Sequence, residues 1–471
     1  MASKLERIYA QLPVSLQNVA VSVQGWLYNR GRYGKSYPQY VNSLMRSQWL
    51  NAEGFRELQT VQLRKLIQEA IEYVPYYRRM LEKFSRNIES VTLHTLKEMP
   101  FIETSLLRTD TKDFLNRQRL RFGHGEGHTS GTSGMPLIFP YDLESVRFNL
   151  AFRERQYRWA GFTGREKSAR FSGRLLMGKH NTWPYWRYNL PENQLLFSSY
   201  HITAETLPDY YEALRGSDVT YLDGYPSSLF NIAKWICENN KQALWRPWAV
   251  FTTGEMLTDY YKSVIEEAFG CRVFNFYSSS EGSPFVTTCP AGRMHVNPES
   301  GIIEFLRANG SDAQRGEQAQ MVVTSFFQKT LPLIRYRIGD VGVLAEQQHC
   351  PCGRQMPVVE RIEGREDDVL YSSERGRVGS AGLSTVLYKI PGRLRQSQIE
   401  QIGDNCFVFR YVPLGNILSE QEKKIVLSEL HSRLGKSAEV RFEQVTEIQK
   451  AARGKSQLVV GLKRSQSRKD L

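Results

Sequence analysis

The pattern of apolar and polar positions changes along the chain and predicts helices first, then strands that alternate with helices. Residues 1 to about 100 have mostly helical spacing. From residue 58 to 73 the apolar side chains recur three or four positions apart, and this pattern stops at Val74 and Pro75. We therefore expect a helical N-terminal region with one helix that ends close to residue 73.

Two other helical patterns carry side chains whose position matters for function. Residues 14 to 27 have apolar residues at mixed spacing, which favours a helix packed on the core and leaves open one that lies on a membrane surface. Residues 143 to 159 form a second helical pattern rich in arginine. We expect its Arg153, Arg155 and Arg158 on a solvated face.

Beyond residue 200 the order of elements predicts an α/β unit. Strand-like runs at 249–253 and 272–276 flank a helical run at 259–269, and a helix at 229–237 could be capped by Ser227 or Ser228. Such alternation is typical of parallel strands, whose carboxyl ends gather ligands. Two polar clusters follow these strand ends: Thr252, Thr253, Gly254 and Glu255, and then Tyr277, Ser278, Ser279, Ser280 and Glu281.

The last third of the chain predicts a second domain. Strand patterns fill residues 301 to 342, and a charged, glycine-containing segment at 361–368 suits a hinge. The remaining hundred or so residues have strand and helix patterns of their own, enough for a small domain. We predict an α/β fold with a large domain at 1–364, built of mixed and parallel sheets with helices, and a small mobile α+β domain at 365–471.

Composition and charge narrow the class of protein. The 471 residues, 41% hydrophobic and 24% charged, are ordinary for a soluble globular chain. The sequence has no apolar run of membrane-spanning length and starts without a secretory core, so we expect a cytoplasmic protein. The net charge of +13 is spread out and matches no nucleic-acid motif, so we expect no nucleic-acid partner. Polyphosphate ligands or peripheral association with an anionic membrane would suit this charge.

A segment rich in hydroxyls and glycines is the first candidate for phosphate binding. Its glycines let the backbone bend so that N–H groups converge on an anion, and it lacks the spacing of a Walker loop. A plain surface loop is the alternative. The segment consists of Thr129, Ser130, Gly131, Thr132, Ser133 and Gly134.

Two pairs of soft ligands predict a second, metal-binding site. Cys289 and His295 form one pair, and Cys350 and Cys352 form the other, each beside a glycine or proline turn. Four such ligands suit tetrahedral Zn²⁺ and leave no open position, which indicates a structural metal. His349 could replace His295, and four residues without a metal remain the alternative.

Several motifs together resemble the adenylate-forming superfamily. Within it the sequence is most similar to the phenylacetate–CoA ligase family, and especially to its CapK-like branch of capsular-polysaccharide biosynthesis proteins. The likeness runs from about residue 40 to about residue 375. The motifs are Thr129 to Gly134, Tyr277 to Glu281, Tyr336-Arg-Ile-Gly-Asp340, Gly364-Arg365-Glu-Asp367, Gly224-Tyr-Pro-Ser-Ser228, Pro332 to Asp340 and Cys350-Pro-Cys-Gly-Arg354.

The resemblance implies an activity and its cofactors. A carboxylic acid, whether acyl, aryl or amino acid, would be activated by ATP and Mg²⁺ to an acyl adenylate with release of pyrophosphate, and then transferred to an amine, a hydroxyl or a thiol. The 1–364 domain would be the adenylation domain. The acceptor stays open between CoA, an amino sugar and another amine, and surface polysaccharide biosynthesis is the expected context. The oligomeric state stays open.

The resemblance also assigns residues. Lys455, Glu281 and Thr132 are expected to act in catalysis, with Glu281 holding Mg²⁺ and Lys450 as the rival of Lys455. The 129–134 loop would bind the β- and γ-phosphates and Ser280 the α-phosphate. Asp340 would bind the ribose and Arg365 the ribose or a phosphate, and Asp367 would be the hinge of a rotating C-terminal domain. The adenine pocket would include Gly254 and Glu255, next to the motif Tyr277, Ser278 and Ser279.

Three hypotheses remain open after the sequence has been read. The first is a polysaccharide-pathway adenylate-forming ligase; the second is an acyl- or aryl-CoA ligase, which is weakened because Tyr371 to Val378 departs from the usual segment of CoA ligases. The third is an inactive nucleotide-binding scaffold. The acid itself cannot be deduced, although Tyr200, His201 and Tyr225 lie near predicted strand ends and could line its pocket.

Overall fold

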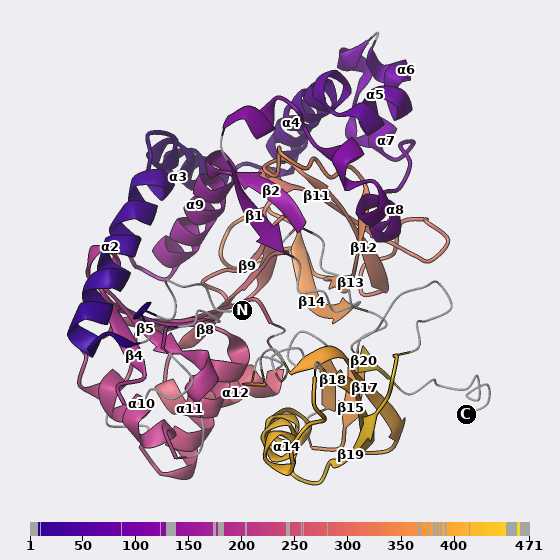
Figure 1. The fold of residues 1–471 in the computed structure, drawn as a ribbon. Coiled ribbons are helices and arrows are strands. Elements are labelled where there is room, and N and C mark those ends of the chain that lie inside the picture. Colours follow the sequence, from indigo (N-terminus) through magenta and orange to yellow (C-terminus); the bar gives the residue numbers. More distant parts are fainter. Residues whose placement is uncertain are drawn as a thin grey trace.

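One long mixed sheet organises the larger part of the computed structural model (Figure 1). Among the described residues this sheet has twelve strands in the order β11-β12-β13-β14-β10-β9-β8-β7-β6-β3-β5-β4. The structure describes residues 8, 9 and 11–461 apart from 86, 123, 129–137, 173–175, 178–182, 203–204, 242–244, 256, 258, 280, 366–368, 375, 380–382, 384–385, 387–388, 391–392, 414 and 449–458.

The strands of this sheet fall into a parallel half and an antiparallel half. The parallel strands are β3 (Ser168–Ser172), β5 (Gln194–Ser198), β6 (Tyr221–Gly224), β7 (Ala249–Thr253) and β8 (Arg272–Tyr277), with β4 (Trp186–Asn189) as an antiparallel edge. The antiparallel strands are β9 (Val286–Thr288), β10 (Met294–Val296), β11 (Gly301–Leu306), β12 (Gln318–Ser325), β13 (Tyr336–Leu344) and β14 (Val358–Arg365). The expected parallel α/β unit is thus present.

Helices cover both faces of the parallel half because its strands are apolar on both sides. Leu222, Val250 and Val273 point into a core shared with α10 (Leu207–Arg215), α11 (Pro226–Glu238) and α12 (Asp259–Phe269). The alternate residues, Phe251 and Phe274 among them, pack on the other face against the end of α9 (Leu143–Trp159). Because β6, β7 and β8 are parallel, their carboxyl ends lie at the same edge of the sheet.

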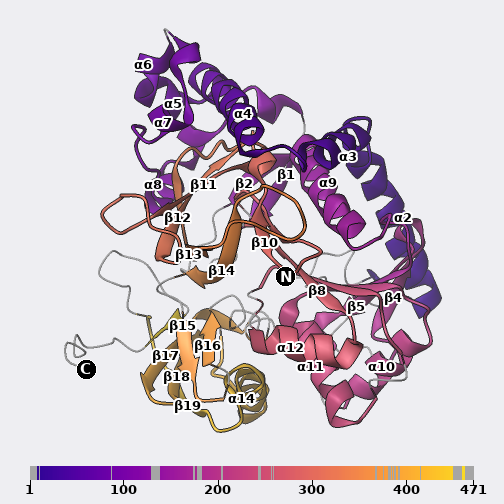
Figure 2. The same ribbon diagram turned by 180° about the vertical axis from the view of Figure 1, so that it is seen from behind.

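The N-terminal region is helical, as predicted, and packs mostly against the antiparallel half (Figure 2). The predicted end of a helix near residue 73 is confirmed, since α4 ends at Tyr73 and Pro75 starts α5. The helices are α2 (Val14–Arg32), α3 (Ser36–Ser47), α4 (Ala52–Tyr73), α5 (Pro75–Met80), α6 (Glu82–Ser85), α7 (Leu93–Leu96) and α8 (Thr104–Thr109). None of the described helices has the length and apolar character needed to cross a bilayer.

A smaller α+β body follows the large sheet. The hairpin β15 (Val369–Ser372) and β16 (Gly376–Gly379) precedes a four-stranded sheet of β17 (Leu394–Gly403), β18 (Cys406–Pro413), β19 (Glu439–Gln444) and β20 (Val459–Val460). Helix α14 (Glu420–Leu434) starts with a capping box of Ser419 and Glu422 and packs its Val426 and Leu430 on this sheet. This architecture confirms the predicted fold class, while the boundary between residues 364 and 365 stays a prediction.

Three local predictions were wrong. Neither Ser227 nor Ser228 caps α11, which starts at Pro226 with Tyr225 as its N-cap and no capping side chain. Arg155 is not solvated but 1% exposed. Arg153 is also mostly buried, with 13% of its side chain exposed, and of the three arginines only Arg158 reaches solvent.

The helix predicted at residues 14 to 27 is present and packs on the core as favoured, but not through most of the apolar side chains of the pattern. Of the apolar residues in this pattern, only Val21 is buried. Leu16, Val19 and Val23 are exposed, and so are the two that follow, Trp26 and Leu27. The helix therefore packs on the core through other side chains.

Candidate active site

The centre of the candidate site joins two motifs that lie far apart in sequence. The Tyr277 hydroxyl, at the end of β8, donates a 2.6 Å hydrogen bond to Asp340 Oδ2 on β13. Burial raises the pKa of the Tyr277 phenol well above its ordinary value, and the negative charges of Asp340 and Glu281 push it in the same direction. The phenol therefore stays a donor, and it fixes one oxygen of the Asp340 carboxylate.

The turn after β8 buries Glu281 beside this pair. The Ser279 and Ser283 hydroxyls each accept a 3.0 Å hydrogen bond from the other residue's backbone N–H, which closes the turn. Gly282 adopts φ +90°, and a Cβ there would lie 2.8 Å from Gln328 Cβ. Glu281 is 4% exposed. Glu281 is thus buried four residues after Tyr277, near enough for its charge to raise the pKa of that phenol.

The backbone brings Arg365 to the same place. Asp340 on β13 faces Arg365 on β14 in the antiparallel register, so two further motifs lie side by side. Nothing is described of the Arg365 side chain. Ser280, the hinge candidate Asp367 and the lysine candidates Lys450 and Lys455 lie outside the described residues.

The predicted phosphate loop, Thr129 to Gly134, is also not described, but the strands on either side of it are. β1 (His124–His128) and β2 (Ile138–Asp142) pair antiparallel, with His128 opposite Ile138. The Thr330 hydroxyl donates a 2.6 Å hydrogen bond to the Pro140 carbonyl on β2. Because Gln328 packs on Gly282, the segment from 328 to 330 connects the base of this hairpin with the Glu281 turn.

The predicted adenine pocket and part of the acid pocket lie next to each other. Gly254 follows β7 at φ +81°, and a Cβ there would lie 2.9 Å from the ring of Tyr225, which follows β6. Glu255 is half-buried at the same edge. Thr253 donates to the Phe276 carbonyl at 2.9 Å, which ties β7 to β8 just before the Tyr277 motif. The parallel strand ends therefore gather these residues as expected.

His201 stands farther along the edge, in the short turn after β5. Its Nδ1 is 2.7 Å from the Ser198 hydroxyl, and its ring stacks on Tyr185. Burial lowers the pKa of His201, and the positive charges of Lys389 and Arg187 lower it further. The imidazole is therefore neutral near pH 7, and the smaller body contributes charge at this edge through Lys389. Nothing is described of the Tyr200 side chain.

The sequence interpretation missed a buried polar network behind these strand ends. Asp223 on β6 is 1% exposed and accepts hydrogen bonds from Arg153, at 2.7 Å, and from the Tyr157 hydroxyl, at 2.6 Å. Burial alone would raise the pKa of Asp223, but the charges of Arg153 and Arg170 hold it below the ordinary value. An acid one residue before the end of a strand, and a helix with Arg153 and Tyr157 four residues apart on one face, could have suggested this network.

A second buried pair ties α9 to the antiparallel half. Arg155 donates at 2.7 Å to Glu299 and at 2.5 Å to the Asn297 side chain, and its guanidinium lies over the Trp159 ring. Arg155 is therefore buried, although the helical pattern predicted it on the solvated face. Periodicity could not reveal it, because the partners are more than 140 residues away in sequence.

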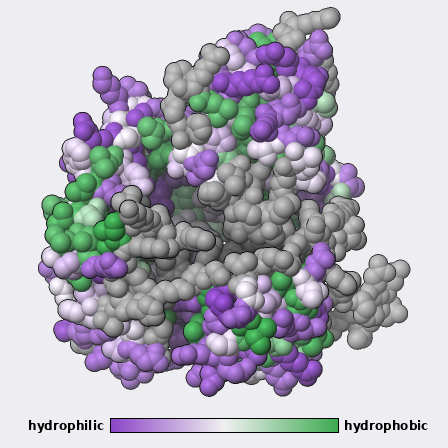
Figure 3. All heavy atoms as spheres, viewed as in Figure 1, coloured by the Kyte–Doolittle hydropathy of each residue, from purple (hydrophilic) through white to green (hydrophobic). Residues whose placement is uncertain are grey.

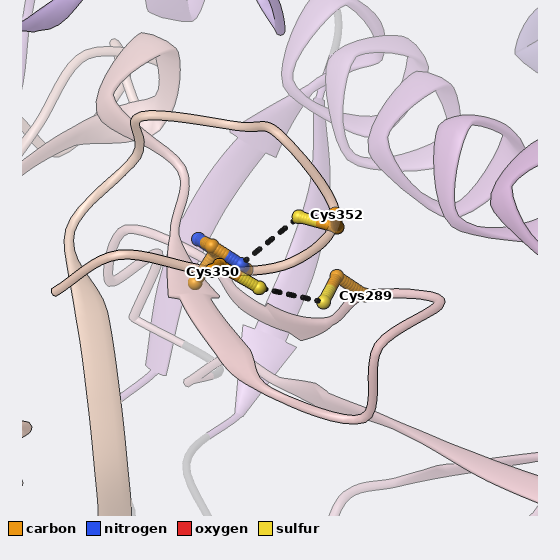
Figure 4. A group of neighbouring side chains, drawn as sticks. Cys289, Cys350 and Cys352 are labelled. Carbon is orange, nitrogen blue, oxygen red and sulfur yellow. Dashed lines mark hydrogen bonds between the residues drawn. The ribbon is translucent and has the colours of Figure 1, made fainter. Parts of the chain in front are cut away.

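The four soft ligands also meet. Cys289, His295, Cys350 and Cys352 place their ligand atoms within 4.8 Å of one another. The Cys289 and Cys350 sulfurs are 3.6 Å apart, as are the Cys352 sulfur and His295 Nε2 (Figure 4). His295 Nδ1 lies 3.1 Å from the Met356 carbonyl, which holds the ring with Nε2 turned to the sulfurs. His349 is exposed and is not a member of the cluster.

The donor chemistry of this cluster fits Zn²⁺. Burial lowers the pKa of His295 to about 4, so the imidazole is neutral, as a ligand must be. Burial raises the pKa of Cys289 to about 12, so its thiolate is costly without a cation beside it. The cluster joins the β9–β10 hairpin to the 345–357 connection between β13 and β14. These are the two strands that carry Asp340 and Arg365.

Comparison with known proteins agrees with the motifs. The family description "CapK C-terminal domain" matches residues 370–461. Protein CapK of Staphylococcus aureus is 28% identical over 465 residues, 97% of this chain and 99% of that protein. A phenylacetate–coenzyme A ligase of Thermus thermophilus is 24% identical over 373 residues, 74% of this chain and 79% of the other. The chain is therefore similar over nearly its whole length to a CapK protein, and over about three quarters of it to a phenylacetate–CoA ligase.

Solved structures share the fold of this chain. 2-Hydroxyisobutyryl-CoA ligase in the postadenylation state, with an acyl-AMP bound, has a TM-score of 0.58 and 17% identity and covers 89% of this chain and 92% of its own. The same ligase with an acyl-AMP and CoA, in the thioesterification state, gives 0.57 at 18% identity, with 88% and 91% covered. The predicted enzyme class, an adenylate-forming ligase, agrees with these comparisons.

Proposed function

We propose that this protein uses ATP to convert a carboxylic acid to an acyl adenylate, with release of pyrophosphate. The observation that carries the proposal is the cluster of Tyr277, Glu281 and Asp340, drawn from distant segments to the carboxyl edge of parallel strands. Open α/β sheets bind nucleotides at this edge. ATP requires an acceptor for its ribose and a carboxylate for its Mg²⁺, which Asp340 and Glu281 would supply, and β1 and β2, the strands on either side of the glycine-rich segment, are tied to Thr330 close by.

The first step joins a carboxylate oxygen of the acid to the α-phosphorus and breaks the bond from that phosphorus to the bridging oxygen of pyrophosphate. Negative charge builds on the phosphorus during attack, so catalysis consists of positioning and charge stabilisation. Thr129 to Gly134 would donate to the β- and γ-phosphates, with Thr132 among the catalytic donors, and Ser280 would donate to the α-phosphate. Glu281 would hold Mg²⁺, which when bound neutralises phosphate charge.

The ribose and the adenine would be bound by residues at the same edge of the sheet. Asp340 keeps one carboxylate oxygen on Tyr277 and is only half-buried, so it would accept from the ribose hydroxyls. Arg365, its register neighbour, would support the ribose or a phosphate. Gly254 and Glu255 would line the adenine pocket together with Ser278 and Ser279.

Two elements of the proposal lie in the C-terminal part of the chain. Lys455, or in its place Lys450, would bridge the acid carboxylate and the α-phosphate during adenylation. Rotation of the smaller domain about Asp367 would then exclude water from the mixed anhydride and admit the acceptor. The resemblance to the superfamily supports both assignments.

The acid would enter between the strand ends at Tyr225 and His201, with Tyr200 as a further candidate. His201 is neutral and stacked on Tyr185, which suits an uncharged or aromatic group better than a second carboxylate. Phe251 and Phe276 are buried in the core and are not available to line the pocket. The acid is therefore expected to be small or aromatic.

The acceptor in the second step is proposed to be an amine or hydroxyl of a surface-polysaccharide precursor. The similarity to CapK along nearly the whole chain supports this context. A thiol acceptor, CoA, is the second candidate, because the ligase of similar fold binds CoA together with an acyl-AMP. The departure at Tyr371 to Val378 from the usual CoA-ligase segment weighs against CoA.

Zn²⁺ is proposed as a structural ligand of Cys289, His295, Cys350 and Cys352. A closed four-ligand set leaves no position for substrate, so the metal would act on stability. It would hold the connection between β13 and β14 and, through these strands, the spacing of Asp340 and Arg365. The predicted effect of metal removal is a less stable large domain.

The proposal is tested by pyrophosphate release with ATP, Mg²⁺ and a panel of carboxylic acids, followed by addition of CoA or of amino sugars. Acid-dependent release supports adenylation, and the acceptor that yields a stable acyl product identifies the second step. A CoA thioester formed in place of an amide or ester would favour the second candidate. ATP binding without release for any acid would indicate a nucleotide-binding scaffold and contradict the proposal.

A further inference from the structure

Helix α2 packs on the protein mainly through polar side chains, with Val21 as a buried apolar contact, and turns most of its large apolar side chains outward. Gln17 donates to the carbonyls of Tyr9 and Leu12 and accepts from the buried Arg187 on β4. Asn18 accepts from the Tyr188 backbone N–H, and Ser22 donates to the Tyr188 carbonyl. Polar groups that pair with the edge strand β4 thus replace the usual apolar contact face.

Close approach completes this polar interface. Gly25 is buried, and a Cβ there would lie 2.2 Å from the Asn189 side chain at the end of β4. On the next turns of the helix, Arg32 pairs with Glu192 at 3.4 Å. The orientation of α2 is therefore fixed by hydrogen bonds, an ion pair and a glycine, and the helix cannot rotate to bury its other face without losing them.

The opposite face is a continuous exposed apolar surface, here called the α2 face. An α-helix turns by about 100° from one residue to the next, and on this basis the residues of the face lie within an arc of about 100° around the helix axis. Leu190, whose backbone N–H donates to Ser22, extends it onto the neighbouring turn at 67% exposure. Figure 3 shows a hydrophobic patch over α2. The helix residues of the face are Leu16 (50% exposed), Val19 (58%), Val23 (52%), Trp26 (51%) and Leu27 (58%).

The segment of the chain that contains the α2 face is basic. The sequence from residue 7 to residue 52 contains no aspartate or glutamate, but Arg30, Arg32, Lys35 and Arg46 lie in it. Arg30 lies 4.7 Å from the centre of the Trp26 ring, so a cation stands at the edge of the apolar surface. The acidic Glu192 close to the helix is already paired with Arg32.

We propose that the α2 face docks the protein on the surface of an anionic lipid bilayer. Apolar side chains would enter the boundary between headgroups and acyl chains, a tryptophan would lie at the interface, and arginine and lysine would meet the lipid phosphates. A second copy of this chain fits less well, because a two-fold contact between α2 faces would bring together two basic segments without an aspartate or glutamate from residue 7 to residue 52 to pair with their cations.

The test is flotation of the full-length protein with vesicles of phosphatidylcholine alone and with vesicles that also contain phosphatidylglycerol. We expect binding to the anionic vesicles that weakens as salt is raised. Trp26→Gln should lower the partition coefficient about tenfold, since one large apolar side chain leaves the bilayer. Trp248→Gln is the matched control, because Trp248 is 73% exposed before β7 and lies outside the α2 face.

Two further variants separate the alternatives. Arg30→Gln/Lys35→Gln should abolish the preference for phosphatidylglycerol and leave the unfolding temperature unchanged. Wild-type protein that does not float with anionic vesicles at low salt overturns the proposal, as does Trp26→Gln that floats like the wild type. Sedimentation velocity without lipid is the last arm: a dimer that Trp26→Gln converts to monomers, without vesicle binding, would assign the α2 face to self-association.

Discussion

The Tyr277 hydroxyl donates a 2.6 Å hydrogen bond to the carboxylate of Asp340, 63 residues further along the chain. This bond joins the end of the last parallel strand to an antiparallel strand, so it spans the two halves of the sheet. Asp340 is only half-buried, so a ligand at this edge of the sheet can reach its carboxylate. The proposed nucleotide site is built around this acceptor, with Glu281 beside it.

Tyr277→Phe removes the donor and keeps the ring, so it should weaken ATP binding while the fold is retained. A hydrogen bond to a charged acceptor contributes about 1.5 kcal/mol or more, which predicts an increase of about tenfold in KM for ATP. Steady-state pyrophosphate release at varied ATP measures this. Tyr76→Phe, which changes a half-buried tyrosine stacked on Phe114, is the control and should leave KM unchanged.

The elements around this pair could be predicted from sequence, but their meeting point could not. Short apolar runs predict the strands at 249–253 and 272–276. The glycine and serine residues that follow each run predict where the strand ends. Periodicity carries no information on which distant strand lies next to Tyr277. Asp340 was identified as a site residue from its resemblance to a known motif. Its hydrogen bond with Tyr277 is known only from the structure.

Lys455→Ala should impair adenylation far more than ATP binding, because the lysine would act on the carboxylate and α-phosphate only as they react. Pyrophosphate exchange and equilibrium ATP binding measure the two quantities separately. Lys450→Ala is the matched variant, five residues earlier in the same segment. A large loss of exchange in Lys450→Ala together with a normal Lys455→Ala would transfer the role to Lys450.

Cys350→Ser should lower the zinc content of the purified protein and its unfolding temperature, by roughly 3 °C if the metal contributes about 2 kcal/mol. Elemental analysis and thermal unfolding with and without a chelator measure both. Cys406→Ser lies in the smaller sheet, away from the cluster, and should change neither. A wild-type protein without zinc, equally stable with a chelator, would refute the metal site.

Asp223→Asn should destabilise the protein by about 3 kcal/mol at pH 7, because it leaves Arg153 buried without its charge partner. The pKa of Asp223 is lower in the folded protein than its ordinary value, so the unfolded state takes up its proton first as pH falls. The stabilising contribution is thus fully present above about pH 4 and is lost below it. Urea unfolding at pH 7 and below about pH 4 measures this. The free energy of unfolding of the wild type should exceed that of the variant at pH 7, and the difference should become smaller at the acidic pH.

The buried arginines and the outward apolar face of α2 explain where sequence patterns fail. A helical wheel of residues 143 to 159 shows arginines on a polar side, but Arg155 meets Glu299 and Asn297, which only tertiary structure brings near. The helical wheel of residues 14 to 32 misleads in the opposite way, because its apolar side is exposed and part of its polar side is buried. Gln17 accepts a hydrogen bond from Arg187 on the edge strand β4, Ser22 donates to that strand, and Gly25 approaches it closely, and this contact decides which face is buried.

The most direct test of the central claim is isotope exchange between pyrophosphate and ATP in the presence of carboxylic acids. Exchange requires a reversible acyl adenylate and nothing from the acceptor step. We predict acid-dependent exchange in the wild-type protein and its loss in Glu281→Gln, a variant of equal size that keeps its circular dichroism spectrum and loses the charge that would hold Mg²⁺. Exchange at the wild-type rate in Glu281→Gln would contradict the account of the site.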